Sequence, residues 1–212
     1  MAAGPQQARS ADSTNRMLAA GEELFLAGGS DALKLEAIIE RAGTSTGSFY
    51  ARFGSMQGYL DALHDRSLVR IEESLAPVIA KAGRQTNLDD TLHVLVEGSL
   101  KELRRNRASL YYFAVGGTQA PHTRERGTIF VLAFREALVH LTSRFLEEPS
   151  SSDAQRRLDM MWRLFFAMGV QQVMFNPDEV SPVRLSDRAL AREWSAALSA
   201  LIAGFAVSAD SE

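Results

Sequence analysis

The residue types that carry catalysis or bind metals are few in this sequence and are widely spaced. It contains no cysteine, which excludes disulfides and thiolate metal sites. No G-x-S-x-G elbow and no phosphate-binding glycine loop is present. The histidines lack the H-E-x-x-H type of spacing that binds zinc, and each is expected to be a structural or pocket residue. We therefore predict no catalytic residue, no metal site and no cofactor. These histidines are His64, His93, His122 and His140.

Hydroxyl, aromatic and basic side chains are instead concentrated between residues 33 and 53. The pattern predicts a short helix, a tight turn and a second short helix. Gly43 can adopt the positive φ that a sharp turn between helices needs. Ser45 is well placed to cap the second helix. Phe49 and Phe53 lie four residues apart, so they are expected to anchor that helix inward.

The opposite face of this second helix carries groups that can read DNA. Thr44, Thr46, Ser48 and Arg52 are predicted to lie on or near the exposed face. A recognition helix presents its N-terminal residues to base edges in the major groove. Hydroxyls can donate or accept hydrogen bonds there, and a threonine methyl can contact a thymine methyl.

A longer run of residues carries a family resemblance. A first helix ends in Leu24-Phe25 and Gly28-Gly29, and is followed by Ile38-Ile39-Glu-Arg-Ala-Gly43, Ser45, Thr46-Gly47-Ser48-Phe49-Tyr50, Phe53 and Ser55. In order and spacing, the segment from about Asn15 to Leu63 resembles the DNA-binding domain of the tetracycline-repressor (TetR) family. The resemblance covers roughly a quarter of the chain, and the remaining helices match only the family's general plan.

The resemblance implies roles for single residues. Thr46 stands where the family often has a DNA contact, Tyr50 at a common phosphate contact, and Arg52 where a residue often meets the backbone. The alternative role for Tyr50 is packing alone. The alternative for Lys34 and Arg52 is that they are ordinary solvated charges. Lys34 replaces the threonine that usually caps the second helix, and Met56 stands where a lysine commonly opens the fourth. The predicted DNA-binding residues are Lys34, Thr44, Ser45, Thr46, Ser48, Tyr50 and Arg52.

Helical periodicity runs through almost the whole chain, and strand alternation is nearly absent. We predict an all-α fold of about nine helices, with an N-terminal three-helix head that contains the helix-turn-helix and a larger helical bundle after it. Pro77 is expected to kink or end the fourth helix. The predicted segments are a disordered arm (1–12), a DNA-binding domain (13–63), a ligand-binding and dimerisation domain (64–206) and a disordered tail (207–212).

Composition limits the possible partners. The chain has 212 residues, of which 46% are hydrophobic and 23% charged, as is usual for a soluble protein. Its net charge of −3 argues against nucleic acid as a partner, so a prediction of DNA binding must rest on motif and geometry. No stretch approaches the roughly 18 apolar residues of a membrane span, and the start is unlike a signal peptide. We expect a cytoplasmic protein without a membrane partner.

Aromatic residues are concentrated in the middle helices, and pockets between bundle helices are typically apolar and aromatic. The inward stripes there contain no Lys, Asp or Glu, so a strongly charged ligand would leave water without a compensating partner. We therefore expect a small, mostly apolar effector. Trp162 is the best candidate for a pocket wall, with plain core packing as the alternative. The predicted ligand-binding residues are His93, Phe113, Phe130, Phe134, Trp162 and Phe166.

The resemblance implies a homodimeric, ligand-responsive repressor. The last two helices of each subunit would form an intersubunit four-helix bundle, and two recognition helices would enter successive major grooves of a palindrome. An effector would favour a state with wrongly spaced heads. One alternative is a helical ligand-binding protein or enzyme that has lost DNA binding. Another is an adaptor that uses the same bundle to bind a different protein.

Overall fold

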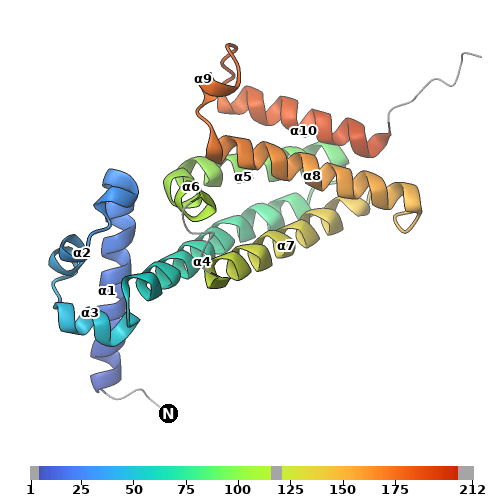
Figure 1. Cartoon of the computed structure of the whole chain (residues 1–212). Helices are drawn as coiled ribbons and strands as arrows, with labels where there is room; N and C mark the ends of the chain where they lie inside the picture. The colour runs from blue at the N-terminus through green and yellow to red at the C-terminus, as the bar shows by residue number, and fades with distance from the viewer. Residues whose placement is uncertain (1–4, 116–120, 205–212) are drawn as a thin grey trace, which may run out of the picture. The chain divides into compact units, whose positions relative to one another are not determined.

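The computed structural model describes residues 5–115 and 121–204. This part of the chain consists of ten α-helices and one 3-10 turn and contains no strand, which confirms the predicted all-α fold (Figure 1). None of the described helices is both long and apolar enough to cross a membrane. The elements are α1 (Pro5–Gly28), η1 (Gly29–Ala32), α2 (Leu35–Ala42), α3 (Thr46–Phe53), α4 (Met56–Gly83), α5 (Leu88–Arg105), α6 (Arg107–Val115), α7 (Pro121–Ser143), α8 (Ser152–Met174), α9 (Pro177–Val180) and α10 (Asp187–Ala203).

The chain divides into two compact units. The first comprises Met1–Arg70 and Ala108–Gly127, and therefore includes α1 to α3, the start of α4, α6 and the start of α7. Apolar side chains from α1 to α4 form its core because each short helix turns one apolar stripe inward. The buried members are Met17, Leu18, Ala20, Leu24, Phe25, Leu33, Ile38, Ala42, Phe49, Tyr59 and Leu63.

A close approach between α1 and α4 shapes this core. Tyr59 is fully buried, and its hydroxyl donates a hydrogen bond to the carbonyl oxygen of Met17 at 2.9 Å. Burial raises the pKa of Tyr59, so the hydroxyl stays a donor. A Cβ atom on Gly21 would lie 1.9 Å from that hydroxyl oxygen. Glycine is therefore required at position 21 for α1 and α4 to pack this closely.

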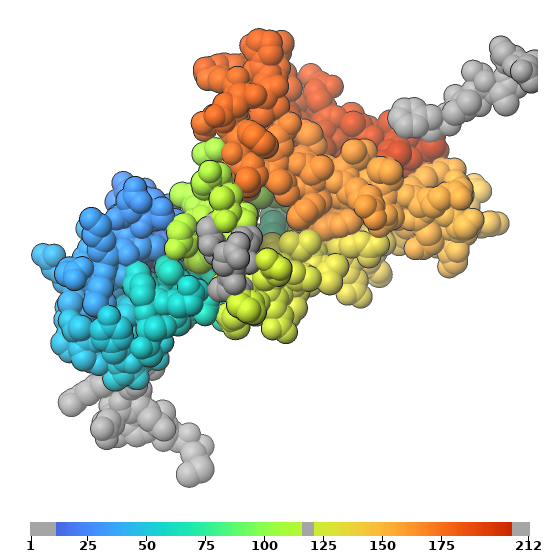
Figure 2. Space-filling model, in the orientation of Figure 1, coloured from blue at the N-terminus to red at the C-terminus, as the bar shows by residue number. Residues whose placement is uncertain are grey.

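The second unit comprises Ile71–Arg107 and Thr128–Glu212. Its helices begin at side-chain caps: Asn87 accepts from the backbone N–H of Asp90 at 2.8 Å, and Ser186 accepts from that of Ala189 at 3.2 Å. Helix α10 packs against α5 and α8, and α5 also packs against α8. In Figure 2, α8 (orange) forms part of the visible surface of this unit. The buried core residues are Ala82, Leu92, Leu95, Val96, Leu100, Leu138, Leu141, Leu158, Met161, Trp162, Phe165, Ala191, Trp194, Leu198 and Ile202.

Three features differ from the sequence pattern. Helix α1 begins at Pro5, inside the predicted disordered arm, because proline suits the first helical position and the residues after it are good helix formers. Pro77 lies within α4 and does not end it. The predicted domain limit at Leu63 also falls inside α4, and the first unit extends beyond it to Arg70. The predicted tail, 207–212, lies outside the described residues.

Candidate functional site

The turn between α2 and α3 has the predicted geometry. Gly43 adopts the left-handed conformation, with φ 58° and ψ 48°. Its N–H donates to the carbonyl oxygen of Glu40 at 3.1 Å, and the N–H of Thr44 donates to that of Ile39 at 3.0 Å. These bonds satisfy carbonyls that would otherwise be unpaired at the end of α2. The turn thus directs the chain into α3 with a fixed geometry.

Helix α3 is fixed at both its start and its inner face. The Ser45 hydroxyl accepts a hydrogen bond from the backbone N–H of Ser48 at 3.2 Å, which confirms the predicted cap. Phe49 is fully buried, and its ring centroid lies 5.1 Å from that of Tyr59 and 5.2 Å from that of Phe53. Because Phe49 must face inward, the rotation of α3 about its own axis is set, and its opposite face is turned to solvent.

The predicted DNA-binding side chains lie along this outer face and the turn before it. Thr46 and Arg52 are exposed, whereas Thr44 and Ser48 are half-buried. Tyr50 is 47% exposed and touches Phe49 edge-on, with 5.5 Å between ring centroids. The Tyr50 hydroxyl is therefore carried on a ring that is held by packing, so the packing role and a phosphate contact are compatible.

Lys34 is exposed at the N-cap of α2, and no side-chain hydrogen bond caps this helix. The loss of the cap is as expected for lysine, which has no acceptor. Helix α4, in contrast, has a side-chain cap at its start: the Ser55 hydroxyl accepts a hydrogen bond from the backbone N–H of Gly58 at 3.0 Å. Met56, where a lysine would add a charge, is half-buried and packs against the core of the unit.

The family comparison agrees with this geometry. Residues 17–63 match the model of a family described as bacterial regulatory proteins, tetR family. This part of the chain is similar to that family. The matched range begins in α1, spans the turn around Gly43, and ends in α4 at Leu63. The matched range therefore contains a helix-turn-helix of the kind found in that family, formed by α2 and α3.

Solved structures extend the fold likeness to nearly the whole chain. A TetR-like transcriptional regulator from Rhodococcus sp. RHA1 is 23% identical, with a TM-score of 0.58, over 91% of this chain and 97% of that one. PfmR, a TetR-family regulator from Thermus thermophilus, is 19% identical, with a TM-score of 0.59, over 89% and 98%. The fatty acid degradation regulator FadR from Bacillus halodurans is 14% identical, with a TM-score of 0.62, over 97% and 99%. No curated protein matches the sequence significantly.

A polar cluster between α4 and α7 in the first unit was not predicted. Asp65 on α4 pairs with His122 at 3.0 Å and with Arg126 at 3.4 Å, and Asp61 accepts from the Thr123 hydroxyl at 3.0 Å. The hydrogen bond to Asp65 raises the pKa of His122. The spacing of four residues between the two aspartates places them on one face of α4, but the sequence alone does not reveal that α7 would meet them.

Next to this cluster, His64 is buried with its ring centroid 4.5 Å from that of Phe113. Burial lowers the pKa of His64, although the adjacent Asp65 opposes this effect. The neighbouring histidines thus favour opposite charge states: His122 favours the cation and His64 the neutral ring.

The predicted ligand-binding residues do not form one group. Phe134, Trp162 and Phe166 lie together in the second unit, with centroid distances from Trp162 of 6.4 Å and 5.6 Å respectively. Phe130 is half-buried one turn before Phe134 on α7, and Phe166 is 43% exposed. Phe113 belongs to the first unit, where it contacts His64 as described above.

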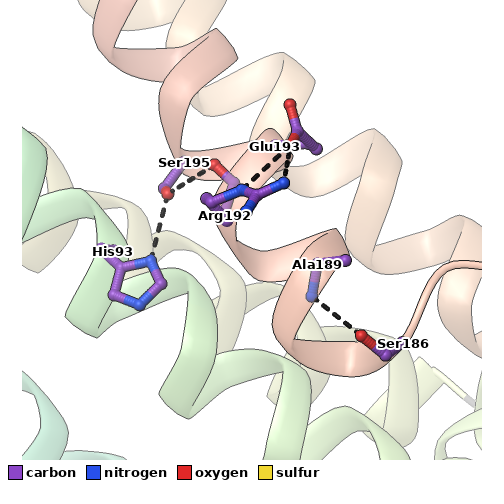
Figure 3. A network of polar contacts seen from close by, with 6 residues as sticks. All are labelled: His93, Ser186, Ala189, Arg192, Glu193 and Ser195. Atoms are coloured by element: carbon purple, nitrogen blue, oxygen red, sulfur yellow. Dashed lines mark hydrogen bonds and ion pairs between the residues drawn. The ribbon is translucent and has the colours of Figure 1, made fainter.

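His93 lies apart from the aromatic group, on α5, where it faces α10 (Figure 3). Its Nδ1 atom is 3.3 Å from the Ser195 hydroxyl, which in turn donates to the carbonyl oxygen of Arg192 at 3.0 Å. A pocket of about 450 Å³ opens here between the two helices. Apart from one alanine, its lining residues are polar or charged, in contrast to the apolar pocket expected from sequence. The lining residues are His93, Ser186, Arg188, Ala189 and Arg192.

Proposed function

We propose that the protein is a homodimeric transcriptional repressor that binds a palindromic operator through α3 and is released by a small, mostly apolar effector. The observation that supports DNA binding most strongly is the fixed rotation of α3. Buried Phe49 and the Ser45 cap together hold Thr46, Tyr50 and Arg52 on the solvent side. Such a regulator acts in the cytoplasm and needs no catalytic residue.

The charge around α3 suits a polyanion even though the whole chain is acidic. Between residues 41 and 60 the sequence contains Arg41 and Arg52 and no aspartate or glutamate. Arg41, on α2, is paired with Glu23 at 3.0 Å, and Arg52 is the basic residue within α3. Because phosphate contacts dominate affinity, a surface without carboxylates avoids repulsion even with few cations. Specificity would then depend on hydroxyl contacts to the bases.

The test of DNA binding uses fluorescence anisotropy with duplex DNA from upstream of the protein's own coding sequence. Replacing Tyr50 by Phe removes the hydroxyl and keeps the ring that packs on Phe49. We expect this variant to bind all sequences more weakly by a similar factor, as for a phosphate contact. A change in base preference without loss of affinity would contradict the assigned role, and equal binding by both proteins would exclude it.

The dimer proposal is supported by an apolar stripe on α8. Met160, Leu164 and Val170 are 48%, 44% and 40% exposed, and the spacing places them on one side of the helix, away from buried Leu158 and Phe165. A second copy of the chain is the proposed occupant, because helix stripes of this kind pair across obligate interfaces. Helix α10, which packs against α8, would form the other part of this dimer interface.

Light scattering with matched variants tests the dimer. Leu164→Glu introduces a charge into the α8 stripe and should yield a monomer at micromolar concentration. Leu132→Glu, on α7, is the control because Leu132 is 55% exposed and lies outside the proposed interface. A monomeric wild-type protein, or dimers of unchanged affinity in Leu164→Glu, would refute the proposal.

The aromatic group of the second unit supports an apolar effector. Trp162 stacks on Phe165, with 6.1 Å between centroids and 14° between planes, and Phe165 lies 5.1 Å from Trp194. The indole Nε1 of Trp194 is buried without a hydrogen-bond partner in the described part of the chain. An unpaired buried donor is costly, so a ligand with one acceptor atom would gain a hydrogen bond there.

Tryptophan fluorescence titrated with hydrophobic compounds tests this site, with Trp162→Phe to isolate the signal of Trp194. We expect a saturable change for at least one compound, and the same compound should weaken DNA binding in the anisotropy assay. If no hydrophobic compound alters DNA affinity, the apolar effector is excluded.

A further inference from the structure

The pocket between α5 and α10 is large enough for a small molecule. Its volume of about 450 Å³ falls within the roughly 300–1,000 Å³ typical of ligand pockets. One wall comes from α5, through His93, and the other from the first two turns of α10 (Figure 3). The two walls are about a hundred residues apart in sequence, so the fold itself creates the site.

Cationic and donor groups converge on this pocket. Arg188 lines it and has no hydrogen-bond or ion-pair partner among the described residues. Arg192 donates from Nε and Nη2 to Glu193 Oε1, at 3.1 and 2.7 Å, which leaves Nη1 for another acceptor. Guanidinium groups bind carboxylate and phosphate oxygens through paired hydrogen bonds. An anion in this pocket would therefore meet two arginine side chains.

The hydrogen bonds next to Arg192 determine which ring nitrogen of His93 is available to a ligand. The Ser195 hydroxyl gives its proton to the Arg192 carbonyl oxygen, so it can only accept from His93 Nδ1. Nδ1 therefore carries a proton, and Nε2 is the nitrogen left to a ligand.

Three carboxylates on these helices have partners of their own. Glu193 pairs with Arg192, Asp187 lies 3.4 Å from Arg104, and Asp89 is hydrogen-bonded to the Ser199 hydroxyl. An anion in the pocket would therefore not face an unpaired carboxylate from these three residues.

The pocket also lies away from the proposed dimer contact. Lining residues Arg188 and Arg192 share one side of α10 with Ser195, whereas Ala197 and Leu201 lie nearly opposite by helical spacing. A ligand in the pocket and a second copy of the chain could therefore bind at the same time.

From these observations we infer that the pocket between α5 and α10 binds a small organic anion through a carboxylate or phosphate group held by Arg188 and Arg192, next to His93. This site is separate from the aromatic group proposed for the apolar effector. It would give the protein a second ligand of opposite chemical character. Its occupancy can be measured without DNA, so the inference does not depend on operator binding.

The test uses the full chain, long-range ¹H–¹⁵N spectra of the histidine side chains, and two probes, succinate and inorganic phosphate. His93→Gln assigns the His93 signal among the four histidines. We expect the His93 signal to shift saturably with at least one probe. Shifts with succinate alone indicate a carboxylate ligand, shifts with phosphate alone a phosphate ligand, and shifts with both indicate recognition of the oxyanion group itself.

Arginine variants then locate the contact. Arg188→Gln and Arg192→Gln should each weaken binding by about tenfold, as expected for the loss of a charged hydrogen bond. The control is Arg156→Gln, an exposed arginine on α8 that also pairs with a carboxylate on its own helix, at 3.1 Å. Circular dichroism shows whether each variant folds. A His93 signal that does not saturate with either probe, or equal affinity in wild type and both pocket variants, would overturn the inference.

Discussion

The contact between Gly21 and Tyr59 allows a quantitative test of how the first unit is packed. In Gly21→Ala the new methyl would lie 1.9 Å from the Tyr59 hydroxyl oxygen and 3.0 Å from the ring carbon that bears it. The ring is fully buried, so it cannot move aside into solvent. In Tyr59→Phe the hydroxyl is absent, and the same methyl would meet the ring carbon and, at 3.3 Å, Cδ1 of the flexible Leu63 side chain.

The magnitudes follow from opposing effects. Alanine favours a helix over glycine by about 1 kcal/mol, whereas overpacking a core costs about 1–3 kcal/mol. Because the 1.9 Å approach favours the upper end of the overpacking cost, we expect Gly21→Ala to lower the free energy of unfolding by up to about 2 kcal/mol in the wild-type background. Tyr59→Phe alone should cost about 1 kcal/mol for the lost hydrogen bond to Met17. In the Tyr59→Phe background, Gly21→Ala should be nearly neutral, which gives a coupling of about 1 kcal/mol or more.

Urea unfolding of wild type, the two single variants and the double variant measures this coupling. Both tryptophans, Trp162 and Trp194, lie in the second unit, so their fluorescence reports on that unit, while far-UV circular dichroism reports on both. The effect should appear in the dichroism transition. Gly127→Ala is the control, because no neighbouring side chain lies within 4 Å of the position that its methyl group would take, and the substitution should stabilise slightly. An equal loss from Gly21→Ala in both backgrounds would refute the packing argument.

Two further predictions concern the same unit. Ser45→Ala should lower the free energy of unfolding by about 1 kcal/mol through loss of the α3 cap and weaken DNA binding, as measured by urea unfolding and anisotropy; an unchanged stability would show that the cap is dispensable. Because the pKa of His122 is raised above 6.5, its pair with Asp65 stabilises fully below pH 6.5 and less as pH rises through the folded-state pKa. The lowered pKa of His64 acts oppositely, stabilising above pH 6.5 and losing this effect as pH falls. Thermal melts of wild type and His122→Gln across this range should therefore converge at high pH, and a constant difference would contradict the assignment.

The features that could be predicted from sequence are local ones. Gly43 in the turn and Ser45 at the start of α3 each act on residues within a few positions, so type and spacing suffice. The inward direction of Phe49 follows from helical periodicity in the same way. For this reason the helix-turn-helix and its exposed face were accessible from the sequence.

The features that could not be predicted depend on contacts between distant residues. His93 meets Ser195 across 102 positions, and His122 meets Asp65 across 57. Nothing in the type or spacing of these residues indicates the partner. The aromatic residues predicted to bind a ligand lie in both units for the same reason, since Phe113 packs in the first unit. The continuation of α4 through Pro77 has a related cause, because packing along a helix of 28 residues outweighs one lost hydrogen bond.

Selection of binding sites from a random duplex pool tests the central claim most directly, because it requires no knowledge of the operator. Wild-type protein should enrich a palindromic motif whose half-sites are about one helical turn, or a multiple of it, apart. Thr46→Ala, which leaves the Ser45 cap and buried Phe49 unchanged, should enrich a motif altered at the base pairs that Thr46 reads. Failure of the folded wild-type protein to enrich any motif would contradict the proposal that α3 recognises DNA.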